Sequence, residues 1–120
     1  MSQKTPRVSL GYQEAYLLDP RGPGSSLRLD TPAWVTWLAE ATTTRFAYPV
    51  FDPAHGYIVG YMTVRKERRQ RGGTYWTAYR RCGRTVRKVY LGHAATLTYT
   101  RLTAIAQAFR EASGAAQRTP

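Results

Sequence analysis

The stretch Arg68–Gly92, RRQRGGTYWTAYRRCGRTVRKVYLG, constrains the fold more than any other part of the sequence. Glycines mark two short turns within it, RGG at 71–73 and GR at 83–84. The segments between them are rich in β-branched and aromatic residues, and such segments joined by short glycine-containing turns are typical of β-hairpins. We therefore expect three antiparallel strands, one running through Arg69, one from Thr74 to Cys82 and one from Thr85 to Leu91.

The two turns determine which side chains share a face of this sheet, because successive residues of a strand point to opposite sides. A two-residue turn at 83–84 pairs Ala78 with Val89 and Trp76 with Leu91. Adding a three-residue turn at 71–73 collects one apolar face, made of Met62, Val64, Trp76, Ala78, Val89 and Leu91. We expect this face to pack against the apolar stripe of a C-terminal helix.

The opposite face receives arginine, lysine and tyrosine, which suit nucleic acid in two ways. Guanidinium groups neutralise phosphates and bind guanine edges in a major groove, which a β-ribbon can enter. Tyrosine rings can stack on unpaired bases, which would favour single strands or RNA. Glu67 is expected to order Arg65 or Arg69 by ion pairing, or to accept a hydrogen bond from a cytosine amino group. The predicted nucleic-acid-binding residues are Arg65, Arg69, Arg71, Tyr75, Thr77, Tyr79, Arg81, Arg84, Lys88 and Tyr90.

The charge of the chain points in the same direction. The net charge is +11, and ten of the 18 lysines and arginines lie between Arg65 and Lys88 beside a single acid, Glu67. Such a density of like charge is unfavourable unless a polyanion relieves it, and nucleic acid is the commonest polyanion. Two other interpretations stay open: a surface that docks on an acidic protein, and a solvated face held by cation–π and cross-strand pairs.

The remaining segments predict further strands and two helices. Alternation from Val8 to Leu18 predicts a strand, a loop follows at 19–26, and LRL at 27–29 is expected to return as a short strand. FAYPVF and YIVGYMTV are strand-like and flank the turn DPAHG. Tyr48, Phe51, Tyr57 and Tyr61 are expected to pack between sheet and helix.

Both helices have clear start signals. Thr31 can cap a helix with Pro32 at its first position, and the apolar side chains Trp34, Trp37, Leu38 and Ala41 follow at helical spacing. We expect both tryptophans to be core residues. Thr98 can cap the last helix, whose apolar stripe comprises Leu102, Ile105, Ala106 and Phe109. Together these elements predict an α+β fold: a mostly antiparallel sheet, with a three-stranded basic part and N-terminal strands, one central helix and one C-terminal helix.

The composition sets the remaining expectations. We expect one domain over residues 1–120, folded from about 8 to 112 and frayed from 113 to 120. The chain lacks an apolar signal segment or a long apolar run, and its single cysteine excludes an internal disulfide, so we expect a cytoplasmic protein that does not enter a membrane.

Catalysis, a metal and a cofactor are not expected. His55 belongs to the DPAHG turn, and His93 is a loop residue after the last strand. Cys82 has no general base nearby in sequence and is most simply a small residue before a turn. The seven acids are scattered, whereas a two-metal nuclease would need clustered carboxylates.

Two resemblances extend this interpretation. The segment TYWTAYRRCGRTVRKVYLGHAATLTYTRLTAIAQAF is similar to the three-stranded sheet and helix of plant AP2-type DNA-binding domains and of the arm-site-binding domains of tyrosine integrases. That likeness covers residues 63–110. It implies that the exposed sheet face enters a major groove while the helix supports it from behind, and it favours DNA over RNA.

A second resemblance spans about Val8 to Ala112. WVTWLAEATTTRFAY, RKERRQRGGTYWTAYRRCGRTVRKVYLG and LTYTRLTAIAQAF together resemble a small N-terminal module of large bacterial regulators, which also carry an ATP-binding region and a C-terminal LuxR-type helix-turn-helix. The matching positions are Trp34, Trp37, Leu38, Arg69, Arg71, Gly72, Gly73, Tyr75, Trp76, Ala78, Tyr79, Lys88, Tyr90, Leu91, Gly92, Thr98, Arg101 and Leu102. The chain ends at Pro120 with neither of those regions, so their control of transcription does not carry over. We expect a free-standing accessory or regulatory unit that binds DNA or, alternatively, an adaptor on an acidic protein or nucleoprotein complex.

Overall fold

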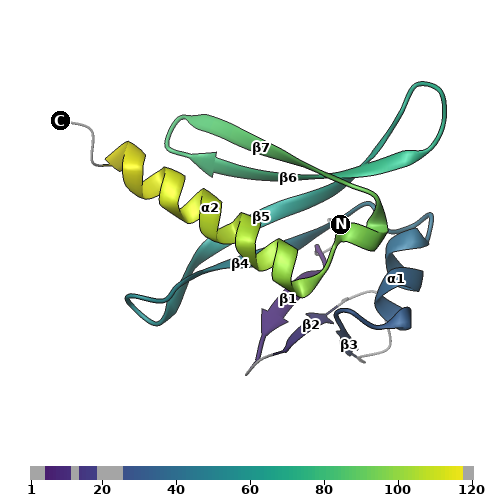
Figure 1. Ribbon diagram of the computed structural model, residues 1–120, viewed down its shortest axis with the longest axis horizontal. Coiled ribbons are helices and arrows are strands. Elements are labelled where there is room, and N and C mark those ends of the chain that lie inside the picture. The colour runs from purple at the N-terminus through teal and green to yellow at the C-terminus, as the bar shows by residue number, and fades with distance from the viewer. Residues whose placement is uncertain (1–4, 12–13, 19–25, 118–120) are drawn as a thin grey trace.

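One mixed sheet organises the part of the chain that the structure, a computed structural model, describes: residues 5–11, 14–18 and 26–117. Its strands lie in the order β3-β2-β1-β4-β5-β6-β7, and all neighbours are antiparallel except the parallel pair β1 and β4 (Figure 1). The α+β architecture expected from the sequence is confirmed. The strands are β1 (Arg7–Leu10), β2 (Ala15–Leu18), β3 (Ser26–Arg28), β4 (Arg45–Asp52), β5 (Tyr57–Arg68), β6 (Thr74–Cys82) and β7 (Thr85–Gly92).

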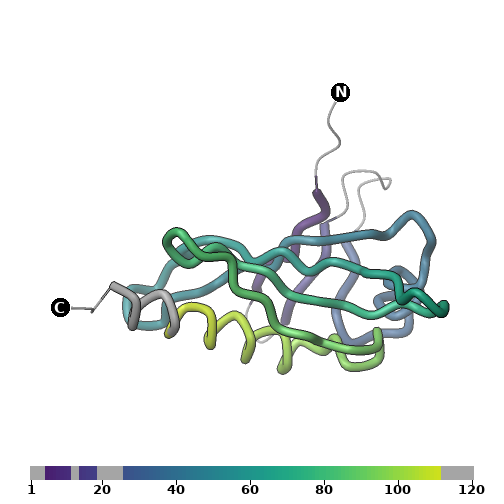
Figure 2. Tube along the Cα trace, turned by 90° about the horizontal axis from the view of Figure 1, so that it is seen from above, coloured from purple at the N-terminus to yellow at the C-terminus, as the bar shows by residue number. Residues whose placement is uncertain are grey.

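The helices leave one face of this sheet open. Helix α2 (Tyr99–Gln117) runs along one side of the strands, and no described helix covers the opposite side (Figure 2). Helix α1 (Pro32–Ala39) lies near the 3-10 helix η1 (Ala94–Thr96), which joins β7 to α2 (Figure 1). None of the described helices is long and apolar enough to cross a membrane.

Helix α1 begins where its capping signals predict. The Thr31 hydroxyl accepts a hydrogen bond from the Trp34 amide at 3.4 Å, and Pro32 occupies the first turn. Trp34 and Trp37 are buried and stacked with ring centroids 5.6 Å apart, which confirms their role in the core. The helix ends at Ala39, so the expected apolar position Ala41 lies beyond it and is exposed.

The N-terminal alternation was interpreted as one strand, and this interpretation is wrong. The Gly11 amide donates to the Glu14 carbonyl at 2.8 Å, which turns the chain back so that β1 pairs with β2. Because the turn changes the phase of the alternation, Ala15 and Leu17 are buried while Leu18 is half exposed. LRL does return as β3 beside β2. Tyr12 and residues 19–25 lie outside the described residues.

The two faces of the basic hairpins are those predicted, although one loop is longer than expected. β5 ends at Arg68, opposite Thr74, and the Arg69 amide donates to the Gly73 carbonyl at 3.0 Å. The connection is therefore 69–73, and the register differs from the predicted one by two residues. Since side chains alternate with a period of two, a shift of two preserves the faces.

The β6–β7 turn is the predicted two-residue turn, with Cys82 paired with Thr85. A bulge at Trp76 and Thr77 pairs Trp76 with Gly92 instead of Leu91. Bulges place two residues of one strand opposite one residue of its neighbour.

Helix α2 buries the predicted stripe against the sheet. Leu102, Ala106 and Phe109 are buried and Ile105 packs against the core. The Thr98 hydroxyl accepts from the Arg101 amide at 3.2 Å, as expected of a cap. The helix continues to Gln117, into the segment that was expected to fray.

Two of the four aromatic residues assigned to the core from the sequence lie elsewhere. Tyr48 is buried, and its hydroxyl lies 2.7 Å from that of Thr103 on α2. Tyr61 is 39% exposed because it alternates with the buried Met62 and so points away from α2. Tyr57 is 57% exposed beside the turn, where its ring stacks on His55. Phe51 is partly buried.

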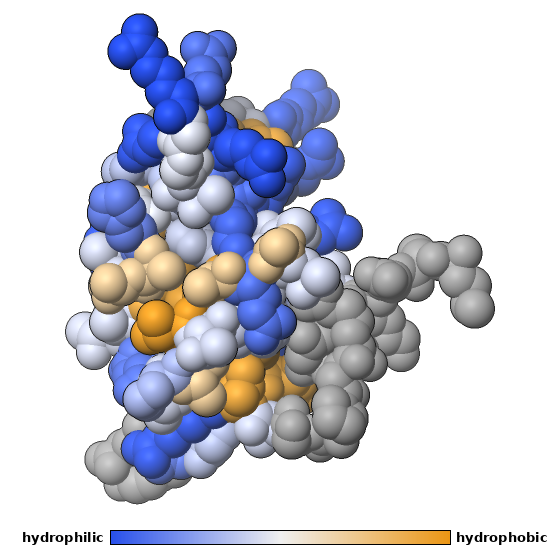
Figure 3. Space-filling model, turned by 90° about the vertical axis from the view of Figure 1, so that its right-hand side faces the viewer, coloured by the Kyte–Doolittle hydropathy of each residue, from blue (hydrophilic) through white to orange (hydrophobic). Residues whose placement is uncertain are grey.

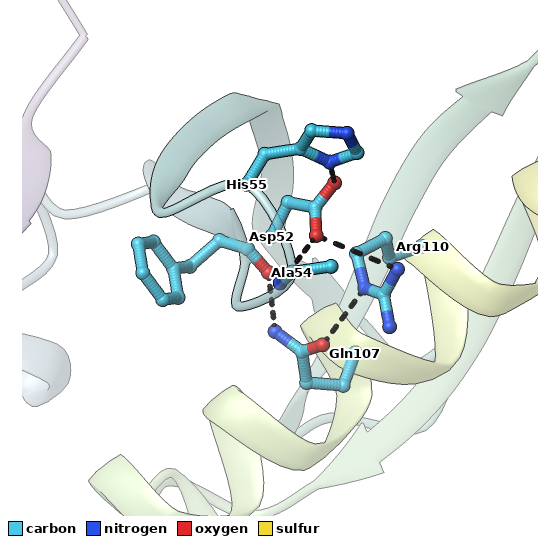
Figure 4. A network of polar contacts seen from close by, with 6 residues as sticks. Asp52, Ala54, His55, Gln107 and Arg110 are labelled. Atoms are coloured by element: carbon cyan, nitrogen blue, oxygen red, sulfur yellow. Dashed lines mark hydrogen bonds and ion pairs between the residues drawn. The ribbon is translucent and has the colours of Figure 1, made fainter.

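A polar network joins the β4–β5 turn to α2 (Figure 4). Asp52 accepts from the Ala54 amide at 2.9 Å and lies 2.7 Å from the His55 ring, so this histidine belongs to the turn as predicted. Arg110 approaches the Asp52 carboxylate at 3.9 Å and donates to Gln107 at 3.0 Å. The Gln107 amide donates in turn to the Phe51 carbonyl at 2.7 Å.

This network predicts a loss of stability in acid. The contact with His55, followed by the Ala54 amide, holds the pKa of the Asp52 carboxyl below its ordinary value of 3.8. A carboxyl whose pKa is lowered by folding stabilises the protein above the unfolded pKa, and this contribution is lost as the pH falls through the folded pKa. Urea unfolding between about pH 5 and about pH 2 should therefore show a shallower decline for Asp52→Asn than for the unmodified protein. Glu111→Gln, which removes an exposed acid from α2, is the control, and an unchanged profile in Asp52→Asn would contradict the prediction.

Candidate nucleic-acid interface

The open face is the side of β4–β7 that points away from α2. Register places Arg65, Thr77 and Tyr90 in one row across β5, β6 and β7, and Tyr79 beside Lys88 in the next row. Tyr75 and Arg81 are separated from Thr77 and Tyr79 on β6 by an even number of positions, so they point to the same face. The structure thus brings seven of the ten predicted residues onto the open face, and the other three, Arg69, Arg71 and Arg84, lie in the connecting loops.

Glu67 is the centre of a hydrogen-bonded cluster on this face. It lies on β5 directly opposite Tyr75, and both the Tyr75 and Tyr79 hydroxyls donate to its carboxylate, the Tyr75 bond at 2.9 Å. Tyr75 and Tyr79 are four residues apart on β6, and their hydroxyls converge on the same carboxylate. The sequence predicted that Glu67 would pair with Arg65 or Arg69 or accept a hydrogen bond from cytosine; its hydrogen-bond donors in the structure are tyrosines, and the charge of Arg65 also acts on the carboxylate.

Arginines cover the tyrosine rings. The Arg69 guanidinium lies 4.9 Å from the Tyr75 ring centre and 5.9 Å from that of Tyr90, and it donates to the Tyr90 hydroxyl at 2.6 Å. The Arg65 guanidinium lies 5.6 Å from the Tyr79 ring centre. Such cation–π contacts contribute about 0.5–1 kcal/mol each at exposed sites, so they fix side-chain positions more than they stabilise the fold.

The same contacts set the charge state of the cluster. Hydrogen bonds from Tyr79 and then Tyr75, with the charges of Arg65 and Lys88, hold the pKa of Glu67 below its ordinary value of 4.5. The bond to Glu67 raises the pKa of each tyrosine above 10.0, because a phenolate would face the carboxylate. At neutral pH the cluster therefore holds one negative charge among several positive ones.

Thr77 does not present a contact surface, contrary to prediction. It lies on the open face but is only 4% exposed. Its short side chain stands between the long side chains of Arg65 and Tyr90 across the sheet and between Tyr75 and Tyr79 along β6. These neighbours cover it, so a ligand would have to displace them to reach it.

Arg45 belongs to the open face, although the sequence did not indicate it. The register of β4 and β5 places Arg45 directly opposite Arg65, and both side chains are exposed. Like charges directly opposite each other across a sheet are destabilising. The position of Arg45 on this face follows only from the pairing of β4 with β5. The alternation of side chains within either strand does not predict that pairing.

The loop arginines lie at opposite ends of the face. Arg71 is exposed in the β5–β6 loop beside Gly72 and Gly73, whose φ values of 92° and 79° favour glycine. Arg84 is exposed in the β6–β7 turn. Because the nine residues of β6 separate them, about 30 Å of strand lies between the two ends. Arg71 and Arg84 can therefore contact only different parts of a long ligand.

The β5–β6 loop projects from the rest of the molecule (Figure 1). Pairing of β5 with β4 ends at Arg65, so the ribbon beyond that point consists of β5, β6 and the end of β7. Hydrophilic side chains gather at this end of the molecule (Figure 3).

Other basic residues of the same segment have structural contacts on the α2 side. Lys66 donates to the Glu40 carbonyl at 2.9 Å and lies 5.4 Å from the Trp76 ring centre, and burial lowers its pKa. Arg80 donates to the Tyr61 carbonyl at 3.0 Å across Gly60, where an added Cβ would lie 2.8 Å from the guanidinium.

The reactive side chains Cys82 and His93 lie at the end of β6 and just after β7. Cys82 is 6% exposed at the end of β6, and its thiol lies 3.9 Å from the Arg80 carbonyl. His93 is exposed before η1. Within the described part of the chain, no three histidine, cysteine or acidic side chains gather where they could hold a metal ion.

Comparisons with models of known protein families, with curated proteins and with solved structures find no match.

Proposed function

We propose that this protein binds nucleic acid without catalysis, through the open face, and that its preferred ligand is duplex DNA. The observation that carries the proposal is the crowding of cations on a sheet face that no described helix covers, including Arg45 directly opposite Arg65. A phosphate between these two guanidinium groups would turn their repulsion into attraction. The cations available to the ligand are Arg45, Arg65, Arg69, Arg71, Arg81, Arg84 and Lys88.

The state of the tyrosines favours a duplex over unpaired bases. Tyr75 and Tyr79 are held by Glu67, and guanidinium groups already lie over the Tyr75 and Tyr79 rings. Stacking on a base requires a free ring face. Breaking these contacts would offset part of the gain from stacking, whereas phosphate binding needs no rearrangement of the rings.

The dimensions of the ribbon also suit a major groove. Three strands about 4.8 Å apart span about 10 Å between the outer strand axes, and the major groove is about 12 Å wide. The three-stranded part of the sheet formed by β5, β6 and β7 can therefore approach the groove with its cations near the phosphates.

Fluorescence anisotropy with duplex DNA, single-stranded DNA and hairpin RNA over a salt series tests this function. We expect duplex DNA to bind most tightly, with micromolar or lower Kd at about 100 mM salt and a log–log salt slope of several units. Tighter binding of single strands would contradict the duplex preference. No binding of any of the three ligands would overturn the proposal and point to an acidic protein partner for the same face.

A further inference from the structure

Glu67 is the one acid between Arg65 and Lys88 in the sequence, and the fold places it on the cationic open face, opposite Tyr75 near the end of β5. It is partly exposed, while the Tyr75 and Tyr79 hydroxyls hold its carboxylate in place. A carboxylate at this position opposes phosphate binding, so it weakens the general affinity that the surrounding cations provide. Its fixed orientation suggests a role other than general affinity.

The carboxylate retains capacity for further hydrogen bonds. An ionised carboxylate offers about four acceptor sites, and the two tyrosine hydroxyls occupy two of them. In the major groove of duplex DNA the hydrogen-bond donors are the amino groups of cytosine N4 and adenine N6. Guanine and thymine present only acceptors and a methyl group there, and a carboxylate would be left without a donor against them.

We propose that Glu67 is a specificity-determining residue, which accepts a hydrogen bond from the exocyclic amino group of cytosine or adenine. This inference rests on the proposed function and adds base selection to it. Arg65, two residues before Glu67 on β5, and Lys88, opposite Tyr79 on β7, hold the phosphates, while Tyr75 and Tyr79 orient the carboxylate towards the floor of the groove. The tyrosines act as positioning residues, and Glu67 makes the contact.

Selection from a random duplex pool tests the inference with three proteins: the unmodified chain, Glu67→Gln and the control Glu111→Gln. Both variants lose one negative charge, so a change in general affinity from charge alone affects them alike. The unmodified protein and Glu111→Gln should enrich cytosine or adenine at a fixed position. Glu67→Gln should lose this preference, because a glutamine amide can donate to guanine or thymine as well as accept. For individual duplexes the expected loss of discrimination is about 5- to 150-fold, the range for one good base contact.

A second variant separates base contact from a structural role. Tyr75→Phe/Tyr79→Phe keeps the carboxylate but removes its anchors, so it should retain the same preferred base with weaker discrimination. Retention of the full preference by Glu67→Gln would overturn the inference, as would equal binding of all sequences by the unmodified protein, and in either case the proposed DNA binding would stand. Failure to bind any duplex would overturn both the proposed function and this inference.

Discussion

Replacing Arg65, Arg81 and Lys88 together by alanine is expected to weaken duplex DNA binding by about 100- to 1,000-fold at about 100 mM salt. Hydrogen bonds to charged groups contribute about 1.5 kcal/mol each, which is roughly tenfold in affinity per contact. All three side chains are exposed on the open face. The log–log salt slope should also fall by about two to three units, because each lost phosphate contact releases about one counterion fewer.

The matched control is Arg68→Ala/Arg87→Ala/Arg101→Ala, which removes the same charge from the other side of the sheet. Arg68 and Arg87 alternate with open-face residues and so point to the α2 side, and Arg101 lies on α2 itself. Binding by this triple variant should fall far less, and its salt slope should change little. Equal losses in the two triple variants would mean that net charge alone, and not the open face, governs binding.

The largest loss of stability is expected from Trp34→Ala, at about 3–5 kcal/mol. Trp34 is 1% exposed, packs edge-on against Phe46 at 5.3 Å and donates from Nε1 to the Leu97 carbonyl at 2.8 Å. The substitution leaves both a cavity and an unpaired buried carbonyl. Urea unfolding followed by the fluorescence of Trp37 and Trp76 gives the free energy of unfolding.

Two further variants serve as controls for the effect of Trp34→Ala on stability. Trp34→Phe keeps most of the volume but removes the donor to Leu97, so we expect a loss of about 1–3 kcal/mol even if Trp34→Ala does not fold. Val35→Ala removes a neighbouring side chain that is 48% exposed, and should change stability by no more than about 0.5 kcal/mol. A loss below about 1 kcal/mol in Trp34→Ala would show that α1 is not anchored through this residue.

Much of the fold was predictable because it depends on local signals. Thr31 and Thr98 are capping residues that define helix starts without reference to distant parts of the chain. The faces of β5–β7 depend only on odd and even positions, so they were predicted correctly although the β5–β6 loop was wrong by two residues. The β1–β2 turn carries no asparagine–glycine or proline signal, and its alternation continues in appearance across Gly11, which is why the hairpin was missed.

The site was less predictable because its details depend on neighbours from other strands. Arg45 joins it only through the register of β4 against β5. Thr77 has the expected orientation, but its exposure depends on the size of four neighbouring side chains. The role of Glu67 depends on two tyrosine hydroxyls that converge from β6, whereas the sequence suggested the nearer arginines as partners.

The juxtaposition of Arg45 and Arg65 has a consequence for the free protein. Like charges at directly opposite positions of a sheet are destabilising, so we expect this register to lower the stability of the unbound protein. Dissolved salt screens this repulsion and also competes with phosphates for the same cations. Added salt should therefore make the unbound chain harder to unfold while it loosens the complex. A polyanion relieves the same repulsion by binding, and it raises the unfolding temperature of the protein by an amount that grows with the logarithm of its concentration relative to Kd.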